Sequence, residues 1–276
     1  MRIVLVRHGE SIMNKIETRL NMFCGALNVP LTEKGRRQAE SIMDSEYILS
    51  LDEVYSSDLI RAHETAKLMI QKTNLELKVD RRIRERSLGI FEGEFRDELE
   101  IKYPEYFRKE DQLKFRRDFV AKAPEGENYT DVCARLTDFF SELDLTSDLK
   151  VGIVSHIHAI RCMLYLLLGL TKEEILKVAV PNSEPIVLEG TAFGNFKLVS
   201  HLKEEILTYY LSLLDMTKWY FITYVAHDAY FLLDVLIFYK LALISNALSS
   251  EIRINIIKQL REKNNLTQAQ LAKKLK

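Results

Sequence analysis

Cysteine is scarce in this sequence, and its number is odd. The 276 residues include three cysteines, Cys24, Cys133 and Cys162, which are widely spaced along the chain. Scattered cysteines in an odd number do not fit a disulfide framework and are typical of reduced thiols in a cytoplasm. The Met1 end shows no secretory signal peptide, because the apolar run RIVLV is too short for its hydrophobic region and is followed by charge. We therefore expect a cytoplasmic protein.

The sequence also lacks a large net charge and a long uncharged apolar run. Its formal net charge is −1 at pH 7. Residues 204–250 contain neither glycine nor proline and are rich in leucine, tyrosine and phenylalanine. Charged residues interrupt this stretch before it reaches the roughly 18 apolar residues of a membrane-spanning helix, so no membrane segment is predicted. We expect amphipathic helices over residues 201–250, forming a bundle or an element through which a homodimer assembles.

Apolar residues are plentiful and make up 47% of the chain. That fraction can fill the core of a sizeable globular domain, and it excludes a disordered chain or a fibre. Residues 1–200 alternate short apolar runs with helical patterns, which indicates βαβ units around a mostly parallel sheet. The predicted fold is a three-layer α/β/α sandwich over residues 1–200, followed by a helical extension over 201–250 and a separate segment, 251–276.

Strands and helices of the first domain can be placed from these runs. Strands are predicted at residues 2–6, 53–57, 150–155, 183–190 and 195–201. Helices are predicted at residues 31–48, 58–71 and 158–169. Thr32 is the expected N-cap of the first helix, and Gly169 is expected to end the third.

Two of the predicted strands are followed by histidine. His8 follows the first strand, between Arg7 and Gly9, and His156 follows the strand at residues 150–155. In an open α/β sheet, ligands bind beyond the carboxyl ends of the strands, so both histidines are expected to face one pocket. A glycine beside His8 would let a ligand approach the backbone. A lone histidine is usually structural, but two at matching strand ends indicate a functional site.

Six motifs follow one another along residues 1–200: RHGES, NVPLTEKGRRQAE, SSDLIRAHETA, RERSLGIFEGE, PEGEN and SHIHAIR. In this order they resemble the histidine phosphatase superfamily, in its phosphoglycerate mutase-like branch. The resemblance implies hydrolysis of a phosphate monoester through a phosphohistidine, with no metal and no cofactor. A phosphoglycerate-type mutase is one alternative, and a DNA-binding regulator that senses a phosphorylated metabolite is another.

The resemblance also implies a role for each matching residue. His8 would be the nucleophile, and Glu85 would protonate the leaving oxygen and then activate water. His156 would act beside them on the phosphate oxygens. Guanidinium groups bind phosphate oxygens in pairs, so such a site can work without a metal. The expected phosphate-binding residues are Arg7, Asn14 and Arg61. We expect partial burial to raise the pKa of Glu85, as its role as an acid requires.

Structural alternatives stay open for several of these residues. Arg61 has His63 and Glu64 as neighbours in sequence and could make a surface ion pair instead. Glu85 could belong to a solvated charge cluster, because four arginines surround it in the sequence: Arg81, Arg82, Arg84 and Arg86. The histidines of SHIH could be metal ligands, but no Cys, Asp or Glu completes a site at recognisable spacing.

Four further residues are candidate substrate contacts. His158 stands where relatives usually have a small residue, so it is expected to narrow the pocket or to touch the substrate. Three arginines could engage a second anionic group, as basic residues do in the mutases, or could form an exposed basic face: Arg96, Arg116 and Arg117. The segment between Glu85 and His156 is shorter than in mutases and ends in PEGEN, which resembles the phosphatases. The expected partner is a small phosphorylated metabolite.

Residues 251–276 resemble the first two helices of a phage-repressor-type helix-turn-helix. Apolar residues recur at helical spacing, and Thr267 with Gln270 forms a capping box at the start of the next helix. The resemblance stops before the recognition helix that would enter the major groove. Seven Lys or Arg against two Asp or Glu could still attract nucleic acid without sequence preference. We therefore expect no sequence-specific binding of nucleic acid.

Overall fold

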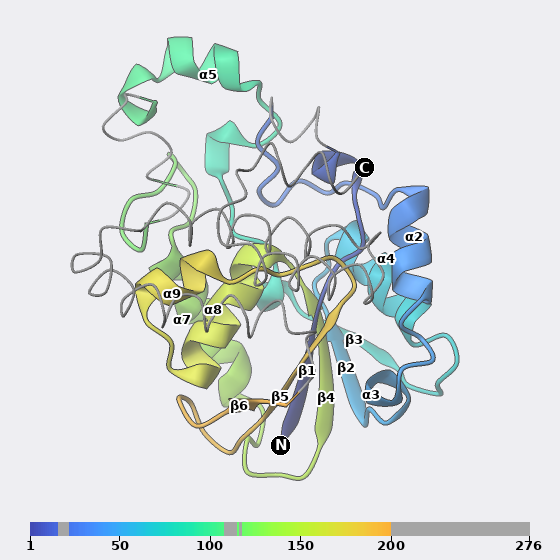
Figure 1. Ribbon diagram of the computed structural model, residues 1–276. Coiled ribbons are helices and arrows are strands. Elements are labelled where there is room, and N and C mark those ends of the chain that lie inside the picture. The colour runs from blue at the N-terminus through green and yellow to red at the C-terminus, as the bar shows by residue number, and fades with distance from the viewer. Residues whose placement is uncertain (16–21, 108–114, 116–117, 200–276) are drawn as a thin grey trace, which may run out of the picture. The chain divides into compact units, whose positions relative to one another are not determined.

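A six-stranded sheet lies at the centre of the part of the chain that the structure describes (Figure 1). The structure is a computed structural model, and it describes residues 1–15, 22–107, 115 and 118–199. The strand order is β3-β2-β4-β1-β5-β6. The strands are β1 (Arg2–Arg7), β2 (Glu53–Ser56), β3 (Leu77–Val79), β4 (Lys150–Ser155), β5 (Pro185–Glu189) and β6 (Lys197–Leu198). In spatial order, the first four strands run parallel, β5 runs antiparallel to β1, and β6 runs antiparallel to β5, which confirms the predicted mostly parallel sheet.

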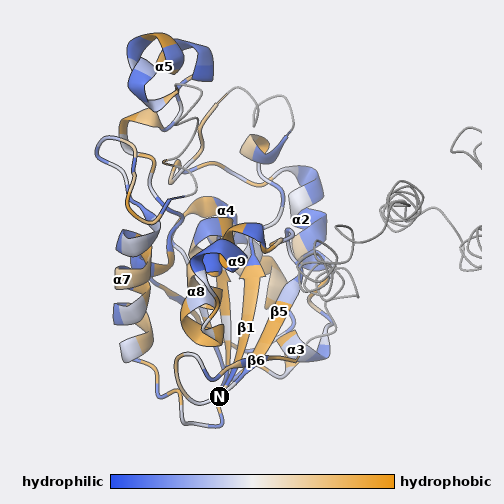
Figure 2. Ribbon diagram, turned by 60° about the vertical axis from the view of Figure 1, so that its left-hand side comes forward, coloured by the Kyte–Doolittle hydropathy of each residue, from blue (hydrophilic) through white to orange (hydrophobic). Residues whose placement is uncertain are grey.

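Helices cover both faces of this sheet, as the three-layer prediction requires. In Figure 1, α2, α3 and α4 lie on one side of the strands, and α7, α8 and α9 lie on the other. The helices are α2 (Glu33–Glu40), α3 (Glu46–Leu49), α4 (Ile60–Met69), α5 (Arg96–Lys102), α7 (Tyr129–Ser141), α8 (Ile157–Leu168) and α9 (Lys172–Lys177). Short 3₁₀ helices span Ile12–Asn14, Arg81–Ile83, Gly89–Phe91 and Pro104–Tyr106. Helix α5 lies away from the sheet (Figures 1 and 2).

The central strands are buried on both faces, which explains their continuous apolar sequence. Four successive residues of β1, Ile3 to Val6, are completely buried, and Figure 2 shows the strands as the most hydrophobic part of the fold. Val4 and Val6 pack in one cluster with Ala62 and Ala66 of α4, while Ile3 and Leu5 point to the opposite face, because side chains alternate along a strand. Burying one such side chain stabilises the fold by about 1.5–3 kcal/mol.

Helix ends agree with the expected capping residues, but one helix is shorter than predicted. Thr32 is the N-cap of α2, and its Oγ1 accepts the N–H of Gly35 at 3.0 Å. Gly169 ends α8 with a φ of 67°, a left-handed conformation that glycine adopts readily. The helix predicted over residues 31–48 stops at Glu40, and α3 forms separately. Strand β3 and helix α7 were missing from the predicted elements.

Gly9 admits another piece of backbone rather than leaving open space beside His8. A Cβ atom at Gly9 would collide with the carbonyl oxygen of Gly35 in α2, and a Cβ atom at Gly35 would collide with the carbonyl oxygen of Glu10. The sequence predicted that the glycine lets a ligand approach, whereas the structure shows that it lets α2 approach. The turn after β1 is therefore packed directly against α2.

The C-terminal predictions concern residues for which the structure gives no description. The described residues belong to a compact unit, Met1–Ile206, and a second unit comprises Leu207–Lys276. The predicted helical extension over 201–250, its dimerisation role and the partial helix-turn-helix over 251–276 all lie outside the described residues. Within the described ranges, no helix is both long and apolar enough to cross a membrane.

Candidate functional site

His8 and His156 lie side by side because their strands are neighbours in the sheet. β1 and β4 pair in parallel with Arg7 opposite Ser155, and the N–H of His8 donates to the carbonyl of Ser155 at 3.0 Å. Both strands therefore end at the same level. The two imidazole rings are buried, and their centroids are 5.0 Å apart. The structure thus brings together the two histidines that the sequence placed at matching strand ends.

The hydrogen bonds of His8 indicate which ring nitrogen carries its lone pair. Nδ1 lies 2.7 Å from the carbonyl oxygen of Gly9, and because a carbonyl only accepts, Nδ1 carries the hydrogen. The second nitrogen, Nε2, accepts a hydrogen bond from Nε of Arg61 at 3.3 Å. Burial, with the charges of Arg61 and Arg7, holds the pKa of His8 well below its usual range. His8 is therefore neutral at physiological pH, with its lone pair on Nε2.

Arg61 is a buried residue of the site and does not make the surface ion pair that its sequence neighbours allowed. Its side chain extends from α4, and the residue is 2% exposed. Its Nη1 donates to the carbonyl of Leu27 at 2.5 Å and its Nη2 to that of Gly25 at 3.1 Å. Glu64 pairs with Arg36 instead. Two carbonyl groups therefore fix the guanidinium beside His8.

Arg7 and Asn14 are also held near the end of β1. Arg7 is the last residue of that strand, and its Nη1 donates to the carbonyl of Val180 at 2.7 Å. Asn14 ends the 3₁₀ helix that follows, and its Oδ1 accepts the N–H of Ser11 at 2.9 Å and the hydroxyl of Ser11 at 3.0 Å. These bonds use the amide oxygen of Asn14 as an acceptor and leave its amide nitrogen as a donor for an anion.

His156 presents a buried nitrogen without a protein partner. Its Nε2 lies 2.9 Å from the hydroxyl of Ser57, which accepts the N–H of Leu59 at 3.2 Å and can donate its own proton to the imidazole. When Ser57 is the donor, the hydrogen of His156 sits on Nδ1, which is buried and has no hydrogen-bond partner among the described residues. Burial, with the charge of Arg61, holds the pKa of His156 well below its usual range. A buried N–H of this kind needs an acceptor, and an anion would supply it.

Glu85 is also buried, so the alternative of a solvated charge cluster is wrong for this residue. It is 7% exposed, and its Oε1 accepts the N–H of Arg86 at 2.8 Å. The other arginines of the segment behave differently from one another. Arg84 pairs with Asp58, and Arg82 pairs with three carboxylates, those of Asp80, Asp138 and Glu142.

The pKa of Glu85 differs from the sequence-based expectation. Burial by itself raises this pKa, but the imidazole of His158 and the N–H donors around the carboxylate outweigh it and hold the pKa well below its usual range. The expected rise is therefore wrong for the protein without a bound ligand. Glu85 is a carboxylate at neutral pH in this state.

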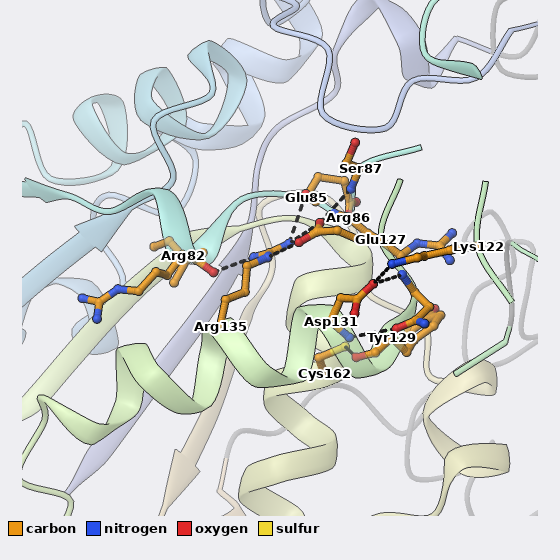
Figure 3. Close-up of polar contacts among 12 residues, drawn as sticks. Arg82, Glu85, Arg86, Ser87, Lys122, Glu127, Tyr129, Asp131, Arg135 and Cys162 are labelled. Carbon is orange, nitrogen blue, oxygen red and sulfur yellow. Dashed lines mark hydrogen bonds and ion pairs between the residues drawn. The ribbon is translucent and has the colours of Figure 1, made fainter. Parts of the chain in front are cut away.

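A half-buried ion pair between Arg135 and Glu127 fastens the loop that carries Glu85 (Figure 3). Arg135 of α7 donates to the carbonyls of Arg82 at 2.5 Å and Glu85 at 3.2 Å, and its Nε donates to Glu127 Oε1 at 2.8 Å. The other oxygen of Glu127 accepts the N–H of Ser87 at 2.9 Å. The backbone on both sides of the acid is thereby attached to α7.

The structure describes two of the four candidate substrate contacts, His158 and Arg96. His158, the second residue of α8, lies with its Nδ1 3.3 Å from Glu85 Oε1. Arg96 pairs with Glu100 along α5 at 2.6 Å. Arg116 and Arg117 lie outside the described residues. In the described part of the chain, no three His, Cys, Asp or Glu side chains are grouped as metal ligands, and His156 and His158 bind different partners.

Several residues that position the site were not singled out from the sequence. The amide nitrogen of Asn182 donates to the carbonyl of His8 at 2.6 Å, and Oγ1 of Thr65 accepts the N–H of Gly9 at 2.9 Å. Ser57 and Thr65 belong to the SSDLIRAHETA motif, and Ser57 directly follows a strand, so the strand-end argument could have found it. Asn182 and Arg135 carry no such signal, because only the fold brings them to the site.

Acidification should destabilise the protein through its buried histidines. His8 and His156 keep pKa values well below the usual histidine value of about 6.5, so below that pH the unfolded chain binds protons that the folded chain excludes. Each group then lowers the free energy of unfolding by up to about 1.4 kcal/mol per pH unit. Urea unfolding between about pH 7.5 and pH 5.5 measures this slope. The variant His8→Asn should have a shallower slope, and an unchanged slope would contradict the assignment.

Comparisons with known proteins agree with this site. The model of the histidine phosphatase superfamily (branch 1) matches residues 3–201. The chain is 32% identical to the 2,3-bisphosphoglycerate-dependent phosphoglycerate mutase 2 of Gloeobacter violaceus, over 71% of this chain and 89% of that protein. The structure is similar to that of a mycobacterial glucosyl-3-phosphoglycerate phosphatase, with a TM-score of 0.61 and 26% identity over 71% of this chain and 96% of the other.

The α-ribazole phosphatase of Shigella flexneri shares the fold, with a TM-score of 0.62 at 23% identity over 72% of this chain and 95% of the other. The matched region contains both strand-end histidines, the buried arginine and the buried carboxylate. These matches and the arrangement of His8, Arg61 and His156 lead to one conclusion: the chain belongs to the histidine phosphatase superfamily.

Proposed function

We propose that this enzyme hydrolyses phosphate monoesters through a phosphohistidine formed on Nε2 of His8. Enzymes of the superfamily, phosphatases and phosphoglycerate mutases alike, act through such an intermediate. The hydrogen bond from Nδ1 of His8 to the carbonyl of Gly9 is the observation that carries the proposal for this residue, because it leaves the lone pair on Nε2. The substrate class is a small phosphorylated metabolite.

In the first step, the lone pair of His8 Nε2 attacks phosphorus, and the bond from phosphorus to the leaving oxygen breaks. Phosphoryl transfer requires positive charge and donors around the equatorial oxygens of the phosphoryl group. We assign this role to Arg7, Arg61 and Nδ1 of His156, with the amide of Asn14 as a further donor. Arg61 is anchored by two carbonyl groups before substrate binds, so little reorganisation is needed. The guanidinium groups provide the charge, and no step requires a metal ion.

Glu85 handles the proton in both steps. A bound phosphate dianion raises the pKa of a nearby carboxyl, so the carboxylate of the free enzyme gains a proton as substrate binds. That proton passes to the leaving oxygen. In the second step, water attacks phosphorus, its proton goes to the Glu85 carboxylate, and the nitrogen–phosphorus bond breaks to release phosphate. His8 regains its lone pair, and Glu85 gives its proton to solvent as phosphate leaves, so the free enzyme again carries a carboxylate.

A phosphoglycerate-type mutase is the second candidate, since a relative with 32% identity carries that name. A mutase must hold an intermediate that still carries a phosphate and must keep water from the phosphohistidine. Arg96, one candidate for a second phosphate site, is already paired with Glu100. The similar mycobacterial structure is a phosphatase. These two observations favour hydrolysis.

Replacing the nucleophile should abolish turnover. His8→Ala should lose phosphatase activity by several orders of magnitude and remain folded, because no neighbouring group can form the intermediate. Rapid quenching of wild type in an alkaline denaturant should trap an acid-labile, base-stable phosphate label that the variant lacks. His63→Ala, a half-buried histidine of α4, is the matched control and should keep both turnover and label. Near-normal turnover by His8→Ala would refute the role of His8.

Hydrolase and mutase can be separated in one incubation with 3-phosphoglycerate and a bisphosphoglycerate primer. We expect release of inorganic phosphate to exceed formation of 2-phosphoglycerate, because nothing described excludes water from the phosphohistidine. A phosphomolybdate assay and NMR of the phosphoglycerates follow the two products together. If isomerisation is faster than phosphate release, the enzyme is a mutase and Arg116 with Arg117 become candidates for its second site.

The C-terminal segment should be dispensable for this chemistry. All proposed catalytic residues precede residue 200, and the resemblance of residues 251–276 to a helix-turn-helix ends before a recognition helix. Removing residues 251–276 should therefore leave kcat/KM within about twofold of the full chain. A loss of kcat/KM by more than about tenfold on this truncation would contradict the assignment of all catalytic groups to residues before 200.

A further inference from the structure

The two oxygens of the Glu85 carboxylate have different surroundings. Oε1 lies 2.8 Å from the N–H of Arg86, 3.2 Å from the N–H of His158 and 3.3 Å from Nδ1 of His158. Oε2 has one described contact, a long one of 3.4 Å to the N–H of His158. Three donors therefore converge on one oxygen and leave the other to exchange a proton.

His158 is oriented by its place in the fold. It occupies the second position of α8, so its backbone N–H is one of the unpaired donors at the start of that helix. Its ring lies edge-on to the ring of Tyr129, with centroids 5.8 Å apart and an interplanar angle of 71°. Because a carboxylate only accepts hydrogen bonds, Nδ1 of His158 carries the hydrogen in the contact with Glu85. The imidazole and the backbone of one residue thus hold the same carboxylate.

We propose that His158 is a positioning residue for Glu85, holding Oε1 through its imidazole so that Oε2 exchanges the proton with the leaving group and with water. This inference rests on the proposed function of Glu85. The contact has a second consequence, because a donor to the carboxylate stabilises its ionised form. His158 therefore favours the state of Glu85 that accepts a proton from water when the phosphohistidine is hydrolysed.

Loss of the imidazole should shift the balance at Glu85 toward the protonated form. Burial raises the pKa of this carboxyl, and the contact with His158 is the largest influence that lowers it. Without the side chain, the N–H groups of Arg86 and residue 158 and the imidazole of His156 would be left to oppose the effect of burial on this pKa. A carboxyl that protonates at higher pH is present as the acid needed in the first step up to a higher pH, and is present as the base needed in the second step over a narrower pH range.

Other titratable and charged groups face the pair from neighbouring elements: His8, Cys24, Arg86, Tyr129, Arg135, His156, Arg161 and Cys162. Burial raises the pKa values of the two thiols and of the phenol, so these stay neutral near pH 7. Burial lowers the pKa values of His8, His156 and His158, so these imidazoles are neutral near pH 7. Because the neighbouring groups do not change charge near neutral pH, the pH dependence of phosphohistidine hydrolysis is assigned to Glu85 and its contact with His158.

The test follows the hydrolysis of the phosphoenzyme as a function of pH. Wild type, His158→Ala and His158→Asn are loaded with p-nitrophenyl phosphate, and loss of the phosphohistidine label is timed. Hydrolysis needs ionised Glu85, so its rate falls at low pH. In His158→Ala this acid limb should move to higher pH by about one to two units, as expected for a lost hydrogen bond to a charged group. The side chain of His158→Asn can still donate an N–H to Oε1, so in this variant the acid limb should move less.

A second measurement separates positioning from a general loss of structure. Loading from p-nitrophenyl phosphate needs little help from an acid because its leaving group is weakly basic, whereas loading from glycerol 2-phosphate needs a proton. His158→Ala should leave the rate of loading from p-nitrophenyl phosphate within about twofold of wild type at pH 7. In the pH profile of loading from glycerol 2-phosphate, the fall in rate at high pH should move to higher pH. His63→Ala is the control and should move neither limb.

Two results would overturn the inference. One is an acid limb in His158→Ala that coincides with that of wild type, and the other is an equal shift in the Ala and Asn variants. If His158→Ala does not fold, the comparison of His158→Asn with wild type tests the inference. An acid limb of the hydrolysis rate that lies about two pH units higher in His158→Asn than in wild type would show that the imidazole does not act as a hydrogen-bond donor to Glu85. Absence of any phosphohistidine on wild type would instead refute the proposed function itself.

Discussion

The parallel pairing of β1 with β4 is the interaction on which the rest of the site depends. Arg7 lies opposite Ser155, and the ladder continues through the N–H of His8 to the carbonyl of Ser155. A slip by one residue would turn the side chains of β1 to the opposite face of the sheet, so the buried apolar residues of both strands fix this register. This register sets the distance between the two histidines that follow the strands, His8 and His156. The site is therefore positioned by the core, and its precision comes from packing rather than from the loops.

Burial of the positive charges around His8 imposes a second constraint. Charged groups removed from water need compensating partners, and here backbone carbonyls provide them. Leu27 and Gly25 hold Arg61, and Val180 holds Arg7. These carbonyls satisfy donors without neutralising the charge, as a carboxylate would. The arrangement leaves net positive charge in a region of low dielectric, where its attraction for a phosphate is stronger than at the surface.

Much of this arrangement could be predicted from the sequence because it is encoded by local patterns. The apolar runs of β1 and β4 predicted buried strands, and the strand-end argument placed His8 and His156 together. The predicted helix over residues 31–48 is longer than α2. The helical spacing of apolar residues continues past Glu40 in the sequence, but the backbone turns there and a separate helix, α3, follows. The pKa of Glu85 could not be predicted, since its direction depends on an imidazole 73 residues away in the chain. Arg135 and Asn182 were missed for the same reason: tertiary contacts alone give them a role.

The bonds between Ser87 and Glu127 have a consequence for how such an enzyme can change its substrate range. The N–H of Glu127 donates to the carbonyl of Ser87 at 2.9 Å, and the Glu127 carboxylate accepts the N–H of Ser87. The chain therefore leaves the loop that carries Glu85 at Ser87 and returns beside it at Glu127. The two ends of the intervening segment are hydrogen-bonded to each other, so the segment is a closed loop. Doubling the length of a flexible loop adds only about 0.6 kcal/mol of closure entropy. Length changes between these two anchor points therefore cost little closure entropy, while the pairing of Ser87 with Glu127 keeps the end of the loop next to Glu85 in place.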